Sequence, residues 1–143
     1  MYKFEKCDSQ KLSQGTSCIC NVYSGEKGEK HSLFIGQVIK LFGNPDYMTD
    51  DYENAFSCAV SAIDDNGNII YLEIYHGASG PAIGGTNDEE ARKAAQALAQ
   101  IIMESEADDY EKEFVYEDIP VKIKMGVKNG IPYYESEFPE EFF

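Results

Sequence analysis

The amino-acid sequence predicts an α+β fold in which about two helices pack on one face of a largely antiparallel sheet. Two observations favour antiparallel pairing: Asn-Gly pairs at 66–67 and 129–130 each lie between runs that read as strands, as is typical of tight hairpins. A third observation is that the two segments with helical spacing, 32–42 and 86–104, do not obviously link parallel neighbours. The predicted order is β-β-α-β-β-α-β-β-β.

Local patterns place the first strands and the first helix. Tyr2 and Phe4 alternate with charged residues, and TSCICNVYS (16–24) repeats a period of two, which predicts two strands. Ser32 is placed to cap a helix that Gly43 ends. The apolar positions of this helix recur at steps of three and four residues: Phe34, Ile35, Val38, Leu41 and Phe42.

The central hairpin is predicted from AFSCAVSAI (55–63) and NIIYLEIYH (68–76), joined by DDNG. Asn66 and Gly67 are both expected to adopt the positive φ angles of a tight turn. The second strand has an apolar face and a mixed face that carries tyrosines and can meet solvent or a partner. The apolar face comprises Ile70, Leu72 and Ile74, and the mixed face comprises Ile69, Tyr71, Glu73 and Tyr75.

The second helix is predicted over 86–104, where Thr86 and Glu89 form a capping box. Its apolar stripe consists of Ala91, Ala94, Ala95, Leu98, Ile101 and Ile102. ESEADDYEKE (104–113) is too charged to bury and indicates a frayed helix end or an exposed loop. An extended segment, EFVYE (113–117), follows it.

The last hairpin joins PVKIKMG (120–126) to IPYYESEF (131–138) through a second Asn-Gly turn. Its first strand alternates between two faces. Val121, Ile123 and Met125 lie on one face, and Lys122 and Lys124 lie on the other.

Composition indicates one globular domain, residues 1–143, that ends in an acidic and aromatic tail at about 135–143. The chain has 26 acidic and 12 basic side chains and a formal charge of −14. A field of this sign repels nucleic acid and anionic lipid and attracts a basic partner. The simpler alternative is that the acidity serves only solubility.

Four cysteines, Cys7, Cys18, Cys20 and Cys58, lie among apolar residues, which is typical of free thiols in the cytoplasm. The start MYKFEKCDSQ has no signal-peptide pattern, and the apolar runs are shorter than the roughly 20 residues that span a bilayer. The CxC spacing has no second pair of ligands. We therefore expect no metal and no cofactor.

The glycine-rich stretch HGASGPAIGGT (76–86) poses the question of a phosphate site. Its spacing matches neither a Walker loop nor a dinucleotide fingerprint, and it contains no lysine or arginine. We therefore expect a structural connection between strand and helix. The alternative is a ligand-binding module or small enzyme that uses residues Gly77–Gly85 and His76, with Asp64 or Asp65 as its partner across the hairpin.

Acidic side chains form two groups that are candidates for binding a basic partner. The first group lies in a polar loop and comprises Asp46, Asp50, Asp51 and Glu53. The second is part of a run of eight acids between Glu104 and Asp118 and comprises Glu104, Glu106, Asp108, Asp109, Glu111 and Glu113. A run this exposed lacks the buried carboxylate of a glycosidase, and no calcium loop is present. The alternative is a solvated face without a partner.

The tail YYESEFPEEFF interleaves aromatic and acidic residues, a pattern typical of protein interfaces. Tyr134, Glu137 and Phe138 are its predicted partner-binding residues. The alternative is that the phenylalanines fold back onto the core.

Small size, one domain, strong acidity, the absence of a catalytic motif and the absence of an export signal together resemble the immunity proteins that bacteria make against polymorphic or contact-dependent toxins. The resemblance concerns the character of the whole chain. It implies a non-enzymatic inhibitor in the cytoplasm that binds a basic toxin domain, often a nuclease, and blocks its active site or substrate surface. An accessory protein that masks another cationic partner would have the same charges.

Overall fold

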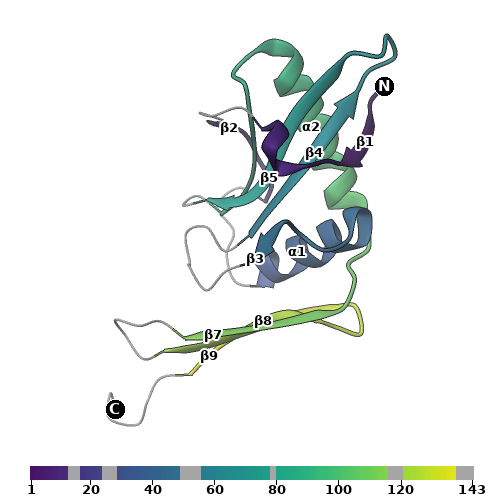
Figure 1. Cartoon of the computed structure of the whole chain (residues 1–143). Coiled ribbons are helices and arrows are strands. Elements are labelled where there is room, and N and C mark those ends of the chain that lie inside the picture. Colours follow the sequence, from purple (N-terminus) through teal and green to yellow (C-terminus); the bar gives the residue numbers. More distant parts are fainter. Residues whose placement is uncertain (13–16, 24–28, 49–55, 78–79, 116–120, 138–143) are drawn as a thin grey trace.

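A computed structural model describes residues 1–12, 17–23, 29–48, 56–77, 80–115 and 121–137. It confirms the α+β class: two α-helices accompany antiparallel sheets (Figure 1). Compared with the predicted order, the structure adds β6 (Gly80–Gly85) and the two-residue β3 (Tyr47–Met48) between the two helices. The strands also divide into two sheets.

The large sheet has the strand order β1-β4-β5-β6-β2, and β3 also pairs with β4. Its other strands are β1 (Lys3–Lys6), β2 (Ser17–Asn21), β4 (Phe56–Ile63) and β5 (Ile69–Gly77). Every pairing in it is antiparallel. As predicted, Leu72 and Ile74 of β5 face the core and are fully buried.

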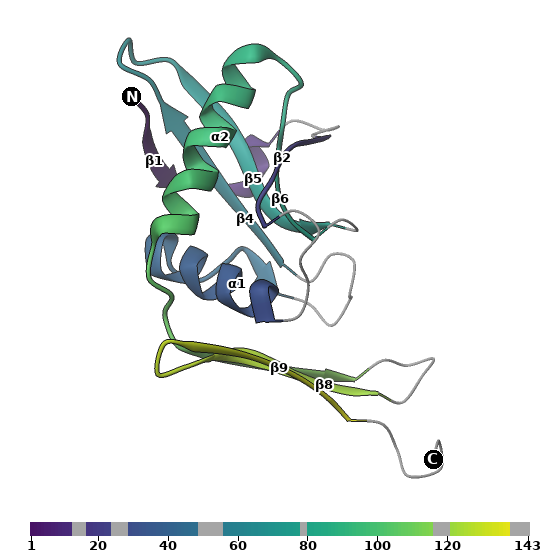
Figure 2. The ribbon, with the colours of Figure 1, turned by 180° about the vertical axis from the view of Figure 1, so that it is seen from behind.

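Both helices pack on the same face of the large sheet. α2 (Glu89–Glu104) lies across that face (Figure 2) and buries its alanine-rich side together with Leu98 and Ile102. α1 (Glu29–Phe42) packs at one end of the sheet, where the Phe34 ring lies 6.0 Å from the ring of Phe56. Side chains of β4, β5 and both helices thus form one core.

The small sheet covers the other side of α1 (Figure 1). It consists of β7 (Tyr110–Val115), β8 (Lys122–Lys128) and β9 (Ile131–Glu137), in that order. Ile123, Met125 and Val127 of β8 are at most 5% exposed, as the alternation of apolar residues predicts. α1 therefore lies between two layers.

The N-terminal segment covers part of the opposite face of the large sheet. Because β1 and β2 lie at opposite edges, the chain between them has to cross the sheet. The 3₁₀ helix η1 (Ser9–Lys11) contacts β4 during this crossing. Ser57 and Ser61 point to this face and are only 2% and 8% exposed.

Two predicted helix caps are wrong. α1 begins before Ser32, whose Oγ donates to the Tyr133 carbonyl at 2.7 Å instead of capping the helix. α2 is capped by Asp88, which accepts from the Ala91 amide at 2.9 Å. Thr86 donates to Asp88 at 2.6 Å, so it supports the cap that it was expected to form.

The two Asn-Gly turns differ. Asn129 and Gly130 both have positive φ, as a two-residue hairpin requires. In the first hairpin Ile63 pairs with Ile69, so the loop spans 64–68 and only Gly67 has positive φ. Asp64 organises this longer loop by accepting from the amides of Asn66 and Asn68, each at 2.9 Å.

Two segments expected as loops are strands. Residues Gly80–Gly85 pair with β5 on one side and β2 on the other, and all six are buried. Glycine leaves room there: a Cβ on Gly84 would meet the Tyr75 ring at 3.1 Å. β7 begins at Tyr110, inside the charged segment, because alternate residues of that segment face α1 and solvent.

Candidate functional site

Several elements begin or end at one end of the molecule, on the left of Figure 1 and the right of Figure 2. There α1 begins, β5 ends and β6 begins, β7 ends, β8 begins and β9 ends. We call this the connection end and define it by Glu29, Gly77, Val115, Lys122 and Glu137.

Half of the net charge belongs to segments that adjoin these element ends or the start of β4, which pairs with the end of β5. Segments 49–55, 116–120 and 138–143 together contain seven acidic and no basic residues, against a total charge of −14. The predicted residues Asp50, Asp51, Glu53 and Phe138 fall in these segments and lie outside the described residues. The described residues thus show where the chain enters and leaves these acidic segments.

One face of the small sheet packs on α1 and the other is exposed. The exposed face carries alternate residues of three strands: Glu111, Glu113, Lys122, Lys124, Lys128, Tyr133, Glu135 and Glu137. Its four glutamates and three lysines give a net charge of −1. The predicted residues Glu111 and Glu113 therefore belong to a face of mixed charge rather than to a purely anionic strip.

Ion pairs on this face join β7 and β8 diagonally. Lys122 Nζ lies 2.9 Å from Glu113 Oε1, and Lys124 Nζ lies 3.6 Å from Glu111 Oε1. All four side chains are about half exposed, so each pair contributes little to stability. Their main effect is to reduce the negative potential over β7.

Tyr133 anchors the middle of the exposed face. Its hydroxyl donates to Glu111 Oε2 at 2.5 Å. This hydrogen bond raises the pKa of Tyr133 to about 12 and lowers the pKa of Glu111. The phenol extends over Gly126, where a Cβ would lie 2.8 Å from the Tyr133 oxygen.

A shallow hollow of about 290 Å³ lies on this exposed face near the connection end. It is lined by Glu113, Lys122, Lys124, Glu135, Ser136 and Glu137. Carboxylates outnumber ammonium groups in it, so a guanidinium or ammonium group is better suited to it than an anion.

Asp108 and Asp109 form contacts within the protein. Asp108 Oδ1 lies 3.7 Å from Lys40 Nζ, and its amide donates to the Gly36 carbonyl at 2.9 Å. Asp109 accepts from the amides of Asn129 and Gly130 at 2.8 and 3.1 Å, and these bonds lower its pKa. Both residues therefore hold the small sheet in place.

Asp46 also forms a structural contact. β1 and β3 pair with successive parts of β4 and leave Ala59 between them. The Asp46 carboxylate accepts from the Ala59 amide at 2.8 Å, and the Ala59 carbonyl accepts from Cys7. Asp46 thus satisfies a strand amide at the sheet edge.

The remaining predicted residues lie apart from one another. Glu104 and Glu106 are exposed and lie where α2 leads into β7, at the end opposite the connection end (Figure 1). Glu137 ends β9 at the connection end. Tyr134 faces inward and packs partly buried against the core, and the phenylalanines of the tail lie outside the described residues. Among the residues that the structure describes, the predicted acids are therefore not gathered into one patch.

The neighbour of His76 is His31, not Asp64 or Asp65. Asp64 and Asp65 precede β5, whereas His76 lies near its far end. Its Nε2 lies 3.2 Å from Nε2 of His31 in the first turn of α1. The two rings meet edge to face with centroids 4.0 Å apart, and the residues are only 7% and 5% exposed. Sequence separation concealed this pair, since no motif links residues 31 and 76.

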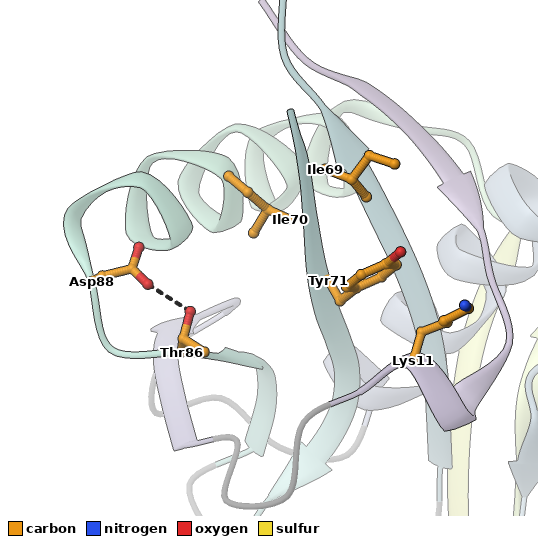
Figure 3. Close-up of a pocket in the computed structure, with 6 residues that line it drawn as sticks. All are labelled: Lys11, Ile69, Ile70, Tyr71, Thr86 and Asp88. Carbon is orange, nitrogen blue, oxygen red and sulfur yellow. Dashed lines mark hydrogen bonds between the residues drawn. The ribbon is translucent and has the colours of Figure 1, made fainter. Parts of the chain in front are cut away.

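A second hollow, also of about 290 Å³, lies beside the start of β5 (Figure 3). Ile69 and Tyr71 point to one side of the strand with Lys11, while Ile70 points toward α2. Thr86 and Asp88, which cap α2, complete the lining. The hollow contains one cation and an isoleucine that is 53% exposed, and no set of groups converges on a common point.

The cysteines are free thiols in the structure. Burial raises the pKa of Cys58 to about 12, so this thiol stays protonated at neutral pH. Within the described ranges, no group of three or more His, Cys, Asp or Glu residues is placed to hold a metal ion. No helix in these ranges is long and apolar enough to cross a membrane.

Comparison with protein-family models, with curated proteins and with solved structures finds no match. Function is therefore inferred from the chemistry of the site itself.

Proposed function

We propose that the protein is an immunity-type inhibitor that binds and neutralises a cognate basic toxin domain, such as a nuclease, at the connection end. The observation that carries the proposal is the location of the charge. Seven of the fourteen net negative charges belong to segments 49–55, 116–120 and 138–143, whose flanking strands end or begin on this side of the molecule. A concentrated negative field speeds the encounter with a basic surface and selects against acidic partners.

The exposed face of the small sheet extends this surface. Glu135 and Glu137 line its hollow beside the connection end and offer carboxylates to lysine or arginine side chains of the partner. Tyr133 supplies aromatic contact area whose position the Glu111 hydrogen bond fixes. In this arrangement the charges set the association rate and the aromatic contacts prolong the complex.

The inhibitor acts in the cytoplasm, where its four cysteines remain reduced. It has no catalytic role in this proposal. It works by covering the active site or the substrate-binding surface of the toxin.

Two double variants with equal charge test the location of the interface. Glu135→Lys/Glu137→Lys changes the connection end, and Glu104→Lys/Glu106→Lys changes the opposite end; each changes the formal charge from −14 to −10. Association of each variant with the protein encoded by the adjacent gene is measured by surface plasmon resonance at two salt concentrations. We expect the association rate to fall at least about tenfold for the first variant and much less for the second.

Rescue of cells that express the adjacent gene product is the functional readout. The proposal predicts that the wild type and the Glu104/Glu106 variant restore growth and the Glu135/Glu137 variant does so poorly. Absence of binding by the wild-type protein contradicts the inhibitor proposal. Equal loss in both variants contradicts only the assignment to the connection end.

A further inference from the structure

The two histidines of the chain meet in the interior, although they lie 45 positions apart. His31 belongs to the first turn of α1, and His76 is the penultimate residue of β5. Their Nε2 atoms are 3.2 Å apart, which is hydrogen-bond distance between ring nitrogens. The contact joins the start of α1 to the end of β5 at the connection end.

The ring geometry argues against a ready-made metal chelate. Two imidazoles on one tetrahedral zinc, with Zn–N distances of about 2 Å, have Nε2 atoms about 3.3 Å apart but ring centroids about 5 Å apart. Here the centroids are 4.0 Å apart and the planes meet at 72°. The lone pairs of the two rings therefore do not converge on one ion.

A hydrogen bond between two imidazoles requires one nitrogen to donate and the other to accept. Protonation of the accepting Nε2 removes the acceptor and places two N–H groups against each other. When the donor ring is protonated as well, at its Nδ1, two cations lie at a distance at which Coulomb repulsion is strong in a buried site. The folded contact therefore excludes the state in which both rings are protonated.

The surroundings reinforce this exclusion. The first turn of α1 is the positive end of the helix dipole, which disfavours a cation at His31. β4 and β5 present Phe56 and Ile74 to the same side as His76, while Glu73 points to the other face and accepts from Ser57.

Titratable groups reach the start of α1 from the small sheet and from α1 itself. The Tyr110 hydroxyl donates to the Ser32 carbonyl, and burial raises the pKa of Tyr110, so it stays neutral. Lys112 shares the inward face of β7, and Lys30 of α1 lies 5.2 Å from the Tyr23 ring.

We propose that the His31–His76 pair is a pH-sensitive latch, which holds the start of α1 against the end of β5 at neutral pH and opens on acidification. The sign follows from proton linkage. An unfolded or opened chain binds protons at both rings near the ordinary imidazole pKa of about 6.5, whereas the closed pair binds no more than one. The open state therefore gains protons as pH falls, and the closed state is lost between about pH 6.5 and pH 5.

Histidine Cε1–H resonances of the wild-type protein test the latch directly between pH 7.5 and 5.5. We expect the two rings to titrate interdependently, and the second proton to bind only together with reduced protection factors of the amides at the start of α1 and the end of β5. A difference of one bound proton changes the opening equilibrium about tenfold per pH unit. Independent titration of both rings near 6.5 with unchanged amide protection factors would overturn the proposal.

Variants supply a second readout that does not depend on assigning resonances. His31→Gln and His76→Gln each leave a single imidazole, so the unfolding equilibrium of either should lose the additional acid sensitivity of the wild type. Carboxylates titrate in all three proteins and cancel in the comparison. Parallel pH profiles for wild type and variants refute the latch. If one variant fails to fold, the other and the wild-type resonances still decide.

A zinc site at the two histidines is the alternative interpretation, and it predicts a different result. Equimolar Zn²⁺ at pH 7.5 should leave both histidine resonances and the melting temperature of the wild type unchanged. Stoichiometric binding that shifts both resonances and is lost in His31→Gln would instead identify a metal site and overturn the latch.

Discussion

The two sheets are stabilised in different ways. The large sheet and α2 bury a continuous apolar surface, in which Leu72, Ile74 and Leu98 have no exposed area. The small sheet buries one face on α1 and leaves the other in solvent. Hydrophobic burial therefore dominates in the first region, while the second depends more on specific contacts at close approach.

These specific contacts are hydrogen bonds and close approaches of the backbone that glycine permits. Ser32 donates to the Tyr133 carbonyl, and Gln37 Nε2 donates to the Ser105 carbonyl at 3.0 Å. At Gly36 an added Cβ would lie 2.9 Å from both Ala107 Cβ and the Asp108 carbonyl oxygen. The chain that leads into β7 can therefore cross α1 only because residue 36 has no side chain. From this difference we expect the small sheet to open locally before the large sheet unfolds.

The largest effect is expected from Leu98→Ala, which removes side-chain atoms from the larger core. The substitution leaves a cavity between α2 and the large sheet and should lower the free energy of unfolding by about 2–5 kcal/mol. Urea denaturation followed by circular dichroism measures it. Ile101→Ala on the same helix is the control: Ile101 is 39% exposed, and a loss below about 1 kcal/mol is expected. Equal losses at both positions would contradict the assigned core.

Gly126→Ala should have a smaller and more local effect. A Cβ at this position would lie 2.1 Å from the Tyr110 carbonyl oxygen, so β7 has to move away from β8. We expect a loss of about 1–3 kcal/mol and faster amide hydrogen exchange in β7 and β8, with exchange in α2 unchanged. Ser136→Ala, at a solvent-exposed position near the end of β9, is the control. Faster exchange spread evenly over both sheets would show that the small sheet does not open independently.

The smallest effect is expected at Asp109. Hydrogen bonds from Asn129 and Gly130 lower its pKa below the ordinary value of 3.8, so it stabilises the hairpin above that value and loses this effect as pH falls through the lowered pKa. Carboxyl ¹³C titration should give a midpoint below 3.8 for Asp109. In Asp109→Asn, the protection factors of the amides of residues 129 and 130 should no longer change with pH in this range. A midpoint at or above 3.8 would contradict the proposed hydrogen bonds from the turn amides to Asp109.

Local sequence determined the fold class, both helices and the type of the second hairpin. The period of apolar residues predicts α2 as far as Glu104, and the Asn129-Gly130 pair predicts the two-residue turn. These features could be predicted because each depends on residues within a few positions of one another. The helix starts were less predictable, since Ser32 and Thr86 both have capping chemistry but bond to other partners.

Tertiary structure alone decided the features that join distant residues. Gly80–Gly85 becomes a central strand because β5 and β2 provide partners on both sides, which glycine spacing does not reveal. The acids between Glu104 and Glu113 lie in different places: on the exposed face of the small sheet, at the 129–130 turn, and at the end opposite the connection end. Strand alternation and the position of the helix end set where each side chain lies. The contact between His31 and His76 arises from packing of α1 on the large sheet. Local propensity acts over a few residues, whereas such contacts depend on how complete elements pack together.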